Sequence, residues 1–191
     1  MDIDVRALTP DLLADYLAYF DHTAFTDNPE WAGCYCYFYL RDPQREDWNT
    51  RSGEQNRASV AALISAGAMQ GYLAYVDGAV AGWCHAAPRS FFPIFANDAD
   101  LGDTDPGTTG AIVCFNVAPG RRRQGIASAL LDAAVRGLTD RGMALAEAYP
   151  GKGGATTDAG HYHGPLEMYL RAGFAVVREL ESCFVVRKSL A

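Results

Sequence analysis

Three consecutive arginines, Arg121, Arg122 and Arg123, lie just before Gly125 and Ala127, between an apolar run and an amphipathic stretch. Glycine and alanine let a ligand approach the backbone closely, and the first amide N–H groups of a helix carry partial positive charge. Together with the guanidinium groups they suit an anion. The segment therefore predicts a cradle for a ligand that carries phosphate.

Two other phosphate-binding patterns do not fit this segment. The Walker loop needs Lys and then Ser or Thr after its last glycine, where this chain has Ile126. The dinucleotide fingerprint needs three spaced glycines and an acid about twenty residues later, and Gly120 and Gly125 do not supply them. A basic helix start that binds nothing is the remaining alternative.

Residues 117–128 read VAPGRRRQGIAS, and through Arg122, Gly125 and Ala127 they resemble the pyrophosphate-binding signature of the GCN5-related N-acetyltransferase (GNAT) superfamily. Residues 168–174 read MYLRAGF and resemble that family's second signature, a tyrosine on a short helix followed by Gly-Phe at the start of the next strand. The two signatures stand in the family's order. The resemblance implies that the chain uses acetyl-CoA as a co-substrate and is an N-acetyltransferase.

The resemblance also implies a role for individual residues. In the family, the acyl chain lies where two parallel strands splay apart, and main-chain N–H groups of the first strand hold the pantetheine and polarise the carbonyl; Phe115 and Val117 match those contacts. Tyr169 matches the frequent general acid, and Glu147 matches a glutamate that several members use as base. The cofactor-binding residues that the first signature implies are Arg122, Arg123, Gln124, Gly125, Ile126, Ala127 and Ser128.

The residues themselves leave the acid and base open. Tyr169 is alternatively an aromatic side chain packed beside the cofactor. Glu147 is the only acid in its apolar run, where partial burial would raise its pKa toward a useful range, but it could instead pair with an arginine. His85, His161 and His163 are competing bases. A nucleophilic Cys114 is disfavoured, because an apolar strand keeps a thiol protonated.

The chain has 191 residues, 49% of them hydrophobic, which is enough for a sizeable core. We expect a single N-acetyltransferase domain over residues 1–191. There is no run of eighteen apolar residues and no basic, apolar leader at the start, so we expect no membrane association and a cytoplasmic protein.

The five cysteines are odd in number and lie mostly in apolar runs, which suits reduced, buried thiols. Cys34 and Cys36 could join His161 and His163 around zinc, but zinc sites usually space their cysteines by two to four residues. We therefore expect no metal.

Net charge is unevenly distributed. Residues 1–110 hold 16 acids and 6 Lys or Arg, a balance of −10, whereas residues 111–191 hold 7 acids and 10 Lys or Arg, a balance of +3. An anionic cofactor fits the basic part, and the acidic part would attract a cationic amine, unless its acids are solvated surface. Nucleic acid is an unfavourable partner for so acidic a chain.

We therefore expect transfer to a primary amine of a small molecule by direct attack in a ternary complex. A protein lysine or N-terminus is an alternative acceptor, and a non-catalytic acyl-CoA-binding sensor is an alternative function. Tyr35, Tyr37, Trp83 and the 97–110 loop would wall a deep pocket for a small amine, whereas an open acidic groove would suit a protein. The sequence is compatible with a homodimer and does not identify the acceptor or the role of the 151–164 insert.

Hydrophobic periodicity, helix caps and turn residues predict the elements that must position these residues. The resemblance implies an α/β (α+β) GNAT fold, a mixed, mostly antiparallel sheet of about seven strands with flanking helices and a splayed parallel pair. The expected strands are 2–8, 71–76, 79–85, 111–117, 144–149, 174–179 and 183–187, and the expected helices are 9–20, 52–66, 125–138 and 165–171.

Overall fold

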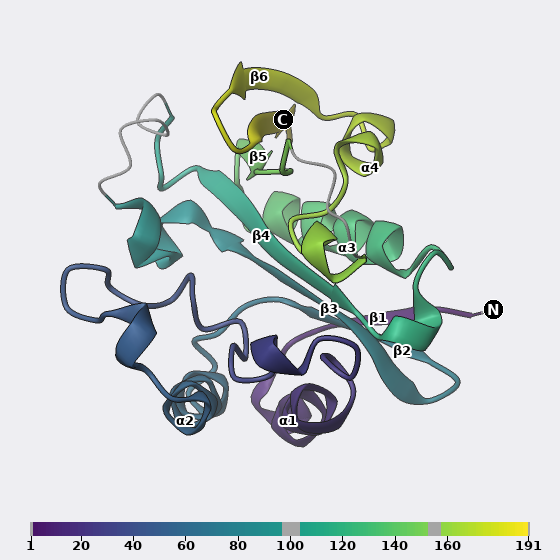
Figure 1. Cartoon of the computed structure of the whole chain (residues 1–191). Coiled ribbons are helices and arrows are strands. Elements are labelled where there is room, and N and C mark those ends of the chain that lie inside the picture. The colour runs from purple at the N-terminus through teal and green to yellow at the C-terminus, as the bar shows by residue number, and fades with distance from the viewer. Residues whose placement is uncertain (1, 97–103, 153–157, 191) are drawn as a thin grey trace.

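The computed structural model describes residues 2–96, 104–152 and 158–190, and its helices and strands follow one another in the predicted order (Figure 1). The strands are β1 (Asp4–Ala7), β2 (Tyr72–Val76), β3 (Ala79–Pro88), β4 (Thr109–Val117), β5 (Leu145–Ala148), β6 (Ala175–Glu179) and β7 (Phe184–Ser189). The helices are α1 (Leu13–His22), α2 (Gly53–Ser65), α3 (Ile126–Asp140) and α4 (Leu166–Arg171).

The seven strands form one sheet in the order β1-β2-β3-β4-β5-β7-β6. Within the described part of the chain, β4 and β5 are parallel and every other neighbouring pair is antiparallel. Helices α1 and α2 cover one face of the sheet, and α3 covers the other (Figure 1). The predicted fold class, a mixed and mostly antiparallel sheet with flanking helices and one parallel pair, is confirmed.

Local chemistry explains several of these boundaries. Asp77 and Gly78 have φ values of 54° and 81°, as the tight turn between β2 and β3 requires of both its central residues. At the start of α2, Ser52 and Gln55 form a reciprocal capping box, which satisfies two amide groups that the helix leaves free. The chain therefore specifies these elements with short-range signals.

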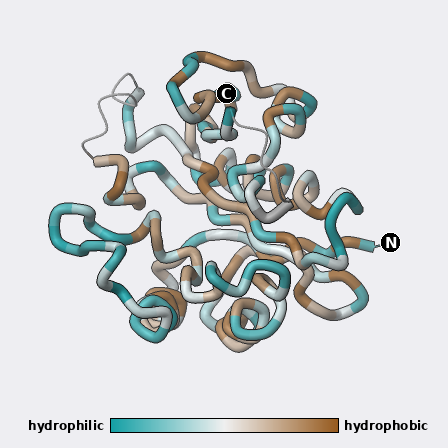
Figure 2. Tube along the Cα trace, in the orientation of Figure 1, coloured by the Kyte–Doolittle hydropathy of each residue, from teal (hydrophilic) through white to brown (hydrophobic). Residues whose placement is uncertain are grey.

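The core lies on both faces of the sheet. Beneath α3, Ile126, Leu130 and Leu138 pack against the strands, and on the opposite face Tyr16 of α1 packs against Trp83 of β3. Figure 2 shows hydrophobic residues gathered along the central strands and hydrophilic ones in the outward loop between α1 and α2. Among the helices described, none combines the length and the apolar character that crossing a bilayer requires.

The parallel pair is short, and its strands separate. Pairing between β4 and β5 ends at Ile112 and Ala148, whereas β4 itself continues to Val117. The edge of β4 beyond Ile112 is called the free edge. Residues 161–164, here called the strap, lie against the free edge, where the Phe115 amide donates a hydrogen bond of 2.6 Å to the Tyr162 carbonyl. The strap therefore occupies part of the gap between the two strands.

Residues 34–39 read CYCYFY, and strict alternation along an extended segment would place Tyr35, Tyr37 and Tyr39 on one face, but the segment is not extended. Tyr35 and Cys36 have φ values of 45° and 55°, so the chain turns at these residues and is not extended there. As a result, Tyr35 and Tyr37 pack in the core beside α1, and Tyr39 packs in a separate apolar cluster. The turned backbone also directs neighbouring side chains toward the cavity described below.

Candidate active site

A cavity of about 1020 Å³ follows the free edge of β4. One end lies at the turn before α3, the middle lies between β4, the strap and α4, and the other end lies against the segment that joins α1 to α2. Four consecutive residues of β4 line the middle, Cys114, Phe115, Asn116 and Val117. The predicted phosphate site, the predicted acyl site and an acceptor region are therefore parts of one space.

The turn before α3 presents helix amides to this cavity. Gly125 is the N-cap residue, with φ of 86°, and no side chain caps the first amides of the helix. A β-carbon at Gly125 would meet no atom within 4 Å, so the backbone there faces open space. Gly125, Ile126, Ala127 and Ser128 all line the cavity, as do Arg121, Arg122 and Arg123.

Uncapped helix amides in a cavity wall are a natural anion site, because they lack intrahelical partners and lie at the positive end of the helix dipole. Gln124 is different from its neighbours. Its side chain is outside the cavity lining and donates to the Gly120 carbonyl at 3.3 Å. Gln124 is therefore the one member of the predicted cofactor-binding set that does not line the cavity.

Arg122 holds the turn in place in addition to lining the cavity. Its Nε donates to the Val117 carbonyl at 3.1 Å, and its two terminal nitrogens pair with the two carboxylate oxygens of Asp27. The hydrogen bonds from Arg122 lower the pKa of Asp27. Such a bidentate pair fixes the guanidinium geometrically, so this side chain ties the turn to the segment after α1.

The strap closes the β4 edge at the positions that the resemblance assigned to the pantetheine. Tyr162 accepts the Phe115 amide, and the Nδ1 of His163 lies 3.0 Å from the Val113 carbonyl. Because that carbonyl can only accept, Nδ1 is the protonated ring nitrogen. In this conformation the Phe115 amide is bonded to the strap, so the predicted ligand contact there requires the strap to move. Val117 lies two residues further along the same edge and lines the cavity.

Tyr169 is completely buried, and its hydroxyl donates to the carbonyl of His163 at 2.7 Å. It is absent from the cavity lining, although its neighbours Gly164 and Met168 are present there. Burial raises the pKa of the hydroxyl, so it carries its proton at neutral pH. With the strap in place, the Tyr169 hydroxyl is bonded within the protein, so the predicted role as an acid requires the strap to move.

Glu147 lies outside the cavity, buried between two guanidinium groups. Arg89 approaches one of its oxygens at 3.2 Å and Arg187 the other at 2.5 Å, and the Tyr149 hydroxyl donates to the first at 2.6 Å. Neighbouring Ala146 and Ala148 pack in the core beneath α3, so alternation turns Glu147 toward the opposite face. Both carboxylate oxygens are occupied, and the prediction that Glu147 is the general base needs correction.

The histidines considered as alternative bases differ in whether they line the cavity, and three of the cysteines line it. His161 lines the cavity and is exposed, whereas His85 is completely buried with its Nδ1 3.3 Å from the Cys36 sulfur. Cys34, Cys36 and Cys114 line the cavity, and burial raises the pKa of Cys34 to about 12. In the described ranges, no three His, Cys, Asp or Glu side chains gather so that they could share a metal ion.

The predicted wall of the acceptor pocket is wrong in its residues. Tyr35, Tyr37 and Trp83 lie in the core and do not line the cavity. Residues 97–103 of the predicted loop lie outside the described residues, and 104–110 are absent from the lining. The side chains that line this end include Trp31, Cys34, Cys36, Phe38, Tyr39 and Trp48.

Sequence reasoning missed Asp27, Trp31 and Tyr162. Asp27 anchors Arg122, and Trp31 packs edge to face on Tyr162 with ring centroids 5.5 Å apart. A local signal existed for the two aromatic residues, since Trp31 follows the polar run Asn28-Pro29-Glu30 and Tyr162 stands between two histidines. In the structure they are 38% and 37% exposed. No local signal marks Asp27, because its partner is 95 positions away in the sequence.

The comparisons with known proteins agree with this geometry. The model of the acetyltransferase (GNAT) family matches residues 29–149, which include β4, the turn and α3. That is more than half of the chain, and the protein belongs to the GNAT family of acetyltransferases. No curated protein matches the sequence.

Solved structures show the same fold at low sequence identity. An N-acetyltransferase from Staphylococcus aureus Mu50 is 13% identical, with all of both chains covered and a TM-score of 0.59. The PaiA N-acetyltransferase of Thermoplasma acidophilum, solved with coenzyme A, is 16% identical with 99% of each chain covered and a TM-score of 0.57. YncA of Salmonella typhimurium, solved with acetyl-CoA, is 14% identical over 99% of this chain and 94% of its own, with a TM-score of 0.53.

Proposed function

We propose that the chain works as a single domain that transfers the acetyl group of acetyl-CoA to a primary amine of a small molecule, by direct attack in a ternary complex. The observation that carries this proposal is the continuity of the cavity. It joins uncapped amides and arginines at one end to a hollow lined with aromatic side chains at the other, past the free edge of β4. A long ligand with an anionic end and a reactive end fits such a space.

In this proposal the diphosphate of the cofactor lies at the start of α3. The amides from Gly125 to Ser128 contact it, and the cations of Arg121 and Arg123 add positive potential. Arg122 contributes mainly by holding the turn through Asp27. Acetyl-CoA, when bound, supplies the acyl group as a thioester, and the edge of β4 at Phe115 and Val117 orients it.

The strap must leave the β4 edge before these contacts can form. Its Tyr162 carbonyl takes the Phe115 amide, and its His163 carbonyl takes the Tyr169 hydroxyl. One displacement of the strap therefore releases both groups. The amide can then polarise the acyl carbonyl, and the hydroxyl, which keeps its proton, can donate it to the departing sulfur.

The bond changes balance without a covalent enzyme intermediate. A bond forms between the amine nitrogen and the acyl carbon, and the carbon–sulfur bond breaks. The thiolate takes the hydroxyl proton of Tyr169, and solvent then returns a proton to Tyr169. The amine loses its own proton to water or to the exposed imidazole of His161. Glu147 takes no part in this scheme, because both its oxygens are already bonded to arginines.

A second function is favoured by one observation. The amide and the hydroxyl that catalysis would need are both engaged within the protein, as they would be in a module that binds acyl-CoA without transferring the group. A sensor of this kind would bind coenzyme A through the turn before α3 and release no thiol from acetyl-CoA in the presence of amines.

Two matched glycine variants test the cofactor site. Gly125 and Gly78 both have left-handed φ values, of 86° and 81°, and both have open space where a β-carbon would lie. We expect Gly125→Val to lose coenzyme A binding in calorimetry, because the added side chain occupies the cradle and strains the turn. Gly78→Val suffers the same backbone strain away from the cavity and keeps the affinity of the wild type.

Free-thiol release from acetyl-CoA with a panel of primary amines tests the reaction. Wild-type coenzyme A binding together with amine-dependent thiol release supports the enzyme. Binding without release under any amine supports the sensor. Unchanged binding by Gly125→Val contradicts the assignment of the turn, whatever the outcome of the thiol assay.

A further inference from the structure

The acceptor end of the cavity is lined by aromatic rings. Trp31, Phe38, Tyr39 and Trp48 all contribute to the wall, and we call these four residues the aromatic end. Phe38 packs edge to face on both Trp48 and Tyr39, with ring centroids 5.2 and 5.4 Å apart. Rings held in this way present a preformed apolar surface at low entropic cost to a ligand.

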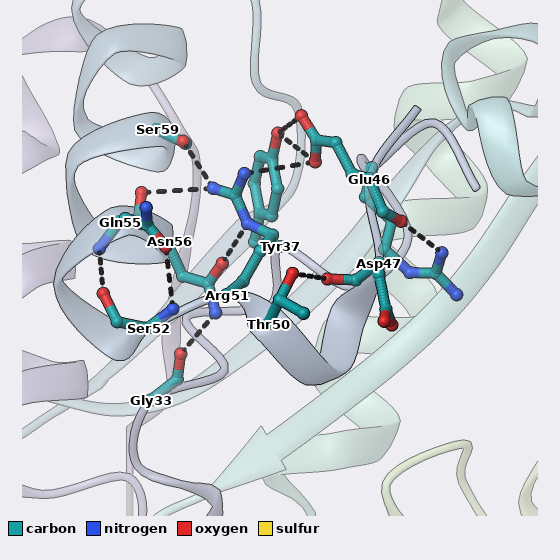
Figure 3. Close-up of polar contacts among 11 residues, drawn as sticks. Gly33, Tyr37, Glu46, Asp47, Thr50, Arg51, Ser52, Gln55, Asn56 and Ser59 are labelled. Atoms are coloured by element: carbon teal, nitrogen blue, oxygen red, sulfur yellow. Dashed lines mark hydrogen bonds and ion pairs between the residues drawn. The ribbon is translucent and has the colours of Figure 1, made fainter. Parts of the chain in front are cut away.

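The one arginine described at this end does not offer a free charge. Figure 3 shows the guanidinium of Arg51 enclosed by its partners. Its nitrogens donate to Asn56 Oδ1 at 2.7 Å, to Ser59 Oγ at 2.8 Å and to Glu46 at 3.2 Å, and the group stacks over the ring of Tyr37 at 4.2 Å. A carboxylate on an incoming ligand would have to compete with Glu46 for this group.

The other polar groups at this end are also satisfied or neutral. Asn56 accepts from Arg51 and donates to the Gly33 carbonyl at 2.8 Å, so its amide is used on both sides. The thiols of Cys34 and Cys36 are kept protonated, because burial raises the pKa of each. What this end presents to a ligand is therefore ring faces and sulfur, with little hydrogen-bonding capacity.

The charge at the mouth has the opposite sign to that at the turn. Exposed Glu30 lines the cavity next to Trp31, whereas the turn contributes Arg121, Arg122 and Arg123. A carboxylate at the mouth attracts an ammonium group, and ring faces stabilise one further through cation–π contact. A ligand that is cationic in solution and apolar in its body suits both features.

We infer that the acceptor is an aromatic monoamine without a carboxylate, in which a primary amine is joined to an aromatic ring by a short alkyl chain. The inference rests on the proposed function and narrows it to one substrate class. The ring packs in the aromatic end, and the neutral amine faces the acyl carbon at the β4 edge. Amino acids fit this surface less well because they carry a carboxylate. Polyamines and aminoglycosides fit it less well because they carry additional cations and no aromatic ring.

The test compares 2-phenylethylamine with L-phenylalanine, which adds a carboxylate, and with 1,4-diaminobutane, which replaces the ring by a second amine. We expect kcat/KM for 2-phenylethylamine to exceed that for each of the others by at least about tenfold, because burying a ring contributes substantially and an unpaired carboxylate opposes binding. Equal or faster turnover of phenylalanine or diaminobutane overturns this inference alone. Absence of thiol release with every amine overturns it together with the proposed reaction.

Two variants place the effect at the aromatic end. Phe38→Leu should raise KM for 2-phenylethylamine about fivefold or more and leave KM for acetyl-CoA unchanged, whereas the same change at Phe91, which lies outside the cavity, should move neither. Glu46→Gln loosens the hold on Arg51 and should raise the relative rate with phenylalanine. Indistinguishable KM values in the Phe38 and Phe91 variants contradict the placement of the ring.

Discussion

His163→Ala offers the sharpest test of the strap, because one side chain anchors it to the β4 edge. The ring donates through Nδ1 to the carbonyl of Val113, a residue that is completely buried, and it also packs against Tyr39 and Tyr162. Removing the ring leaves that carbonyl without its partner only while the strap lies on the edge. The change therefore destabilises the closed strap more than the displaced one.

The expected change in coenzyme A affinity follows from the free-energy cost of leaving the Val113 carbonyl without a hydrogen-bond partner. A buried polar group that loses its partner costs about 1 to 3 kcal/mol. A change of this size shifts the ratio of closed to displaced strap by roughly 5- to 150-fold. Apparent affinity depends on the fraction of molecules that can bind, so coenzyme A binding should tighten by up to that factor, and the gain stops once the displaced strap predominates.

Calorimetry with coenzyme A measures this affinity without turnover. His161→Ala is the matched control, since it removes an imidazole from the same strap without removing a bond to β4, and we expect no gain from it. His163→Gln restores a donor and should return the affinity toward that of the wild type. Unchanged or weaker binding by folded His163→Ala, with circular dichroism matching the wild type, refutes the view that the strap competes with the cofactor.

The pH dependence of stability gives an independent readout of the same side chain. Burial lowers the pKa of His163 to about 4, below the value of about 6.5 that it has in an unfolded chain. Between these values the unfolded protein takes up a proton that the folded protein does not, so this contribution to stability is lost as pH falls from 6.5 to 4. The thermal midpoint of His163→Ala should therefore decline less over this window than that of the wild type.

Two further variants separate the predicted acid from the predicted base. Tyr169→Phe should lower kcat by roughly 100-fold if its hydroxyl protonates the leaving thiolate, and near-normal turnover would reduce the residue to packing. Glu147→Gln should leave the pH–rate profile unchanged. It should lower the free energy of unfolding by about 3 kcal/mol or more, because Arg89 and Arg187 lose their buried counter-ion. A shifted pH–rate profile with full stability would instead indicate that Glu147 is the base.

The turn before α3 could be predicted because its signals are local. Gly125 adopts the left-handed φ that its residue type favours, and small residues and arginines around it line one cavity as expected. The order of helices and strands could be predicted from the sequence for the same reason, since helix caps, tight turns and hydrophobic periodicity each depend on a few neighbouring residues. In contrast, the alternating sequence of residues 34–39 suggested an extended segment with its tyrosines on one face, whereas the backbone turns at Tyr35 and Cys36.

The chemistry of individual side chains depended on partners far away in the sequence. Glu147 looked like an isolated acid in an apolar strand, and only the sheet brings Arg89 and Arg187 to its two oxygens. Likewise, nothing near Phe115 in the chain indicates that the carbonyl of Tyr162 takes its amide.

The sequence by itself determined the family signatures, the order of the elements and the position of the turn proposed to bind an anion, because each depends on the conformational preferences of a few neighbouring residues. The tertiary structure alone decided which groups are free to react. Hydrogen bonds and ion pairs between distant segments satisfy the buried polar atoms, and a group whose bonds are already made within the protein cannot bind a substrate until those bonds break.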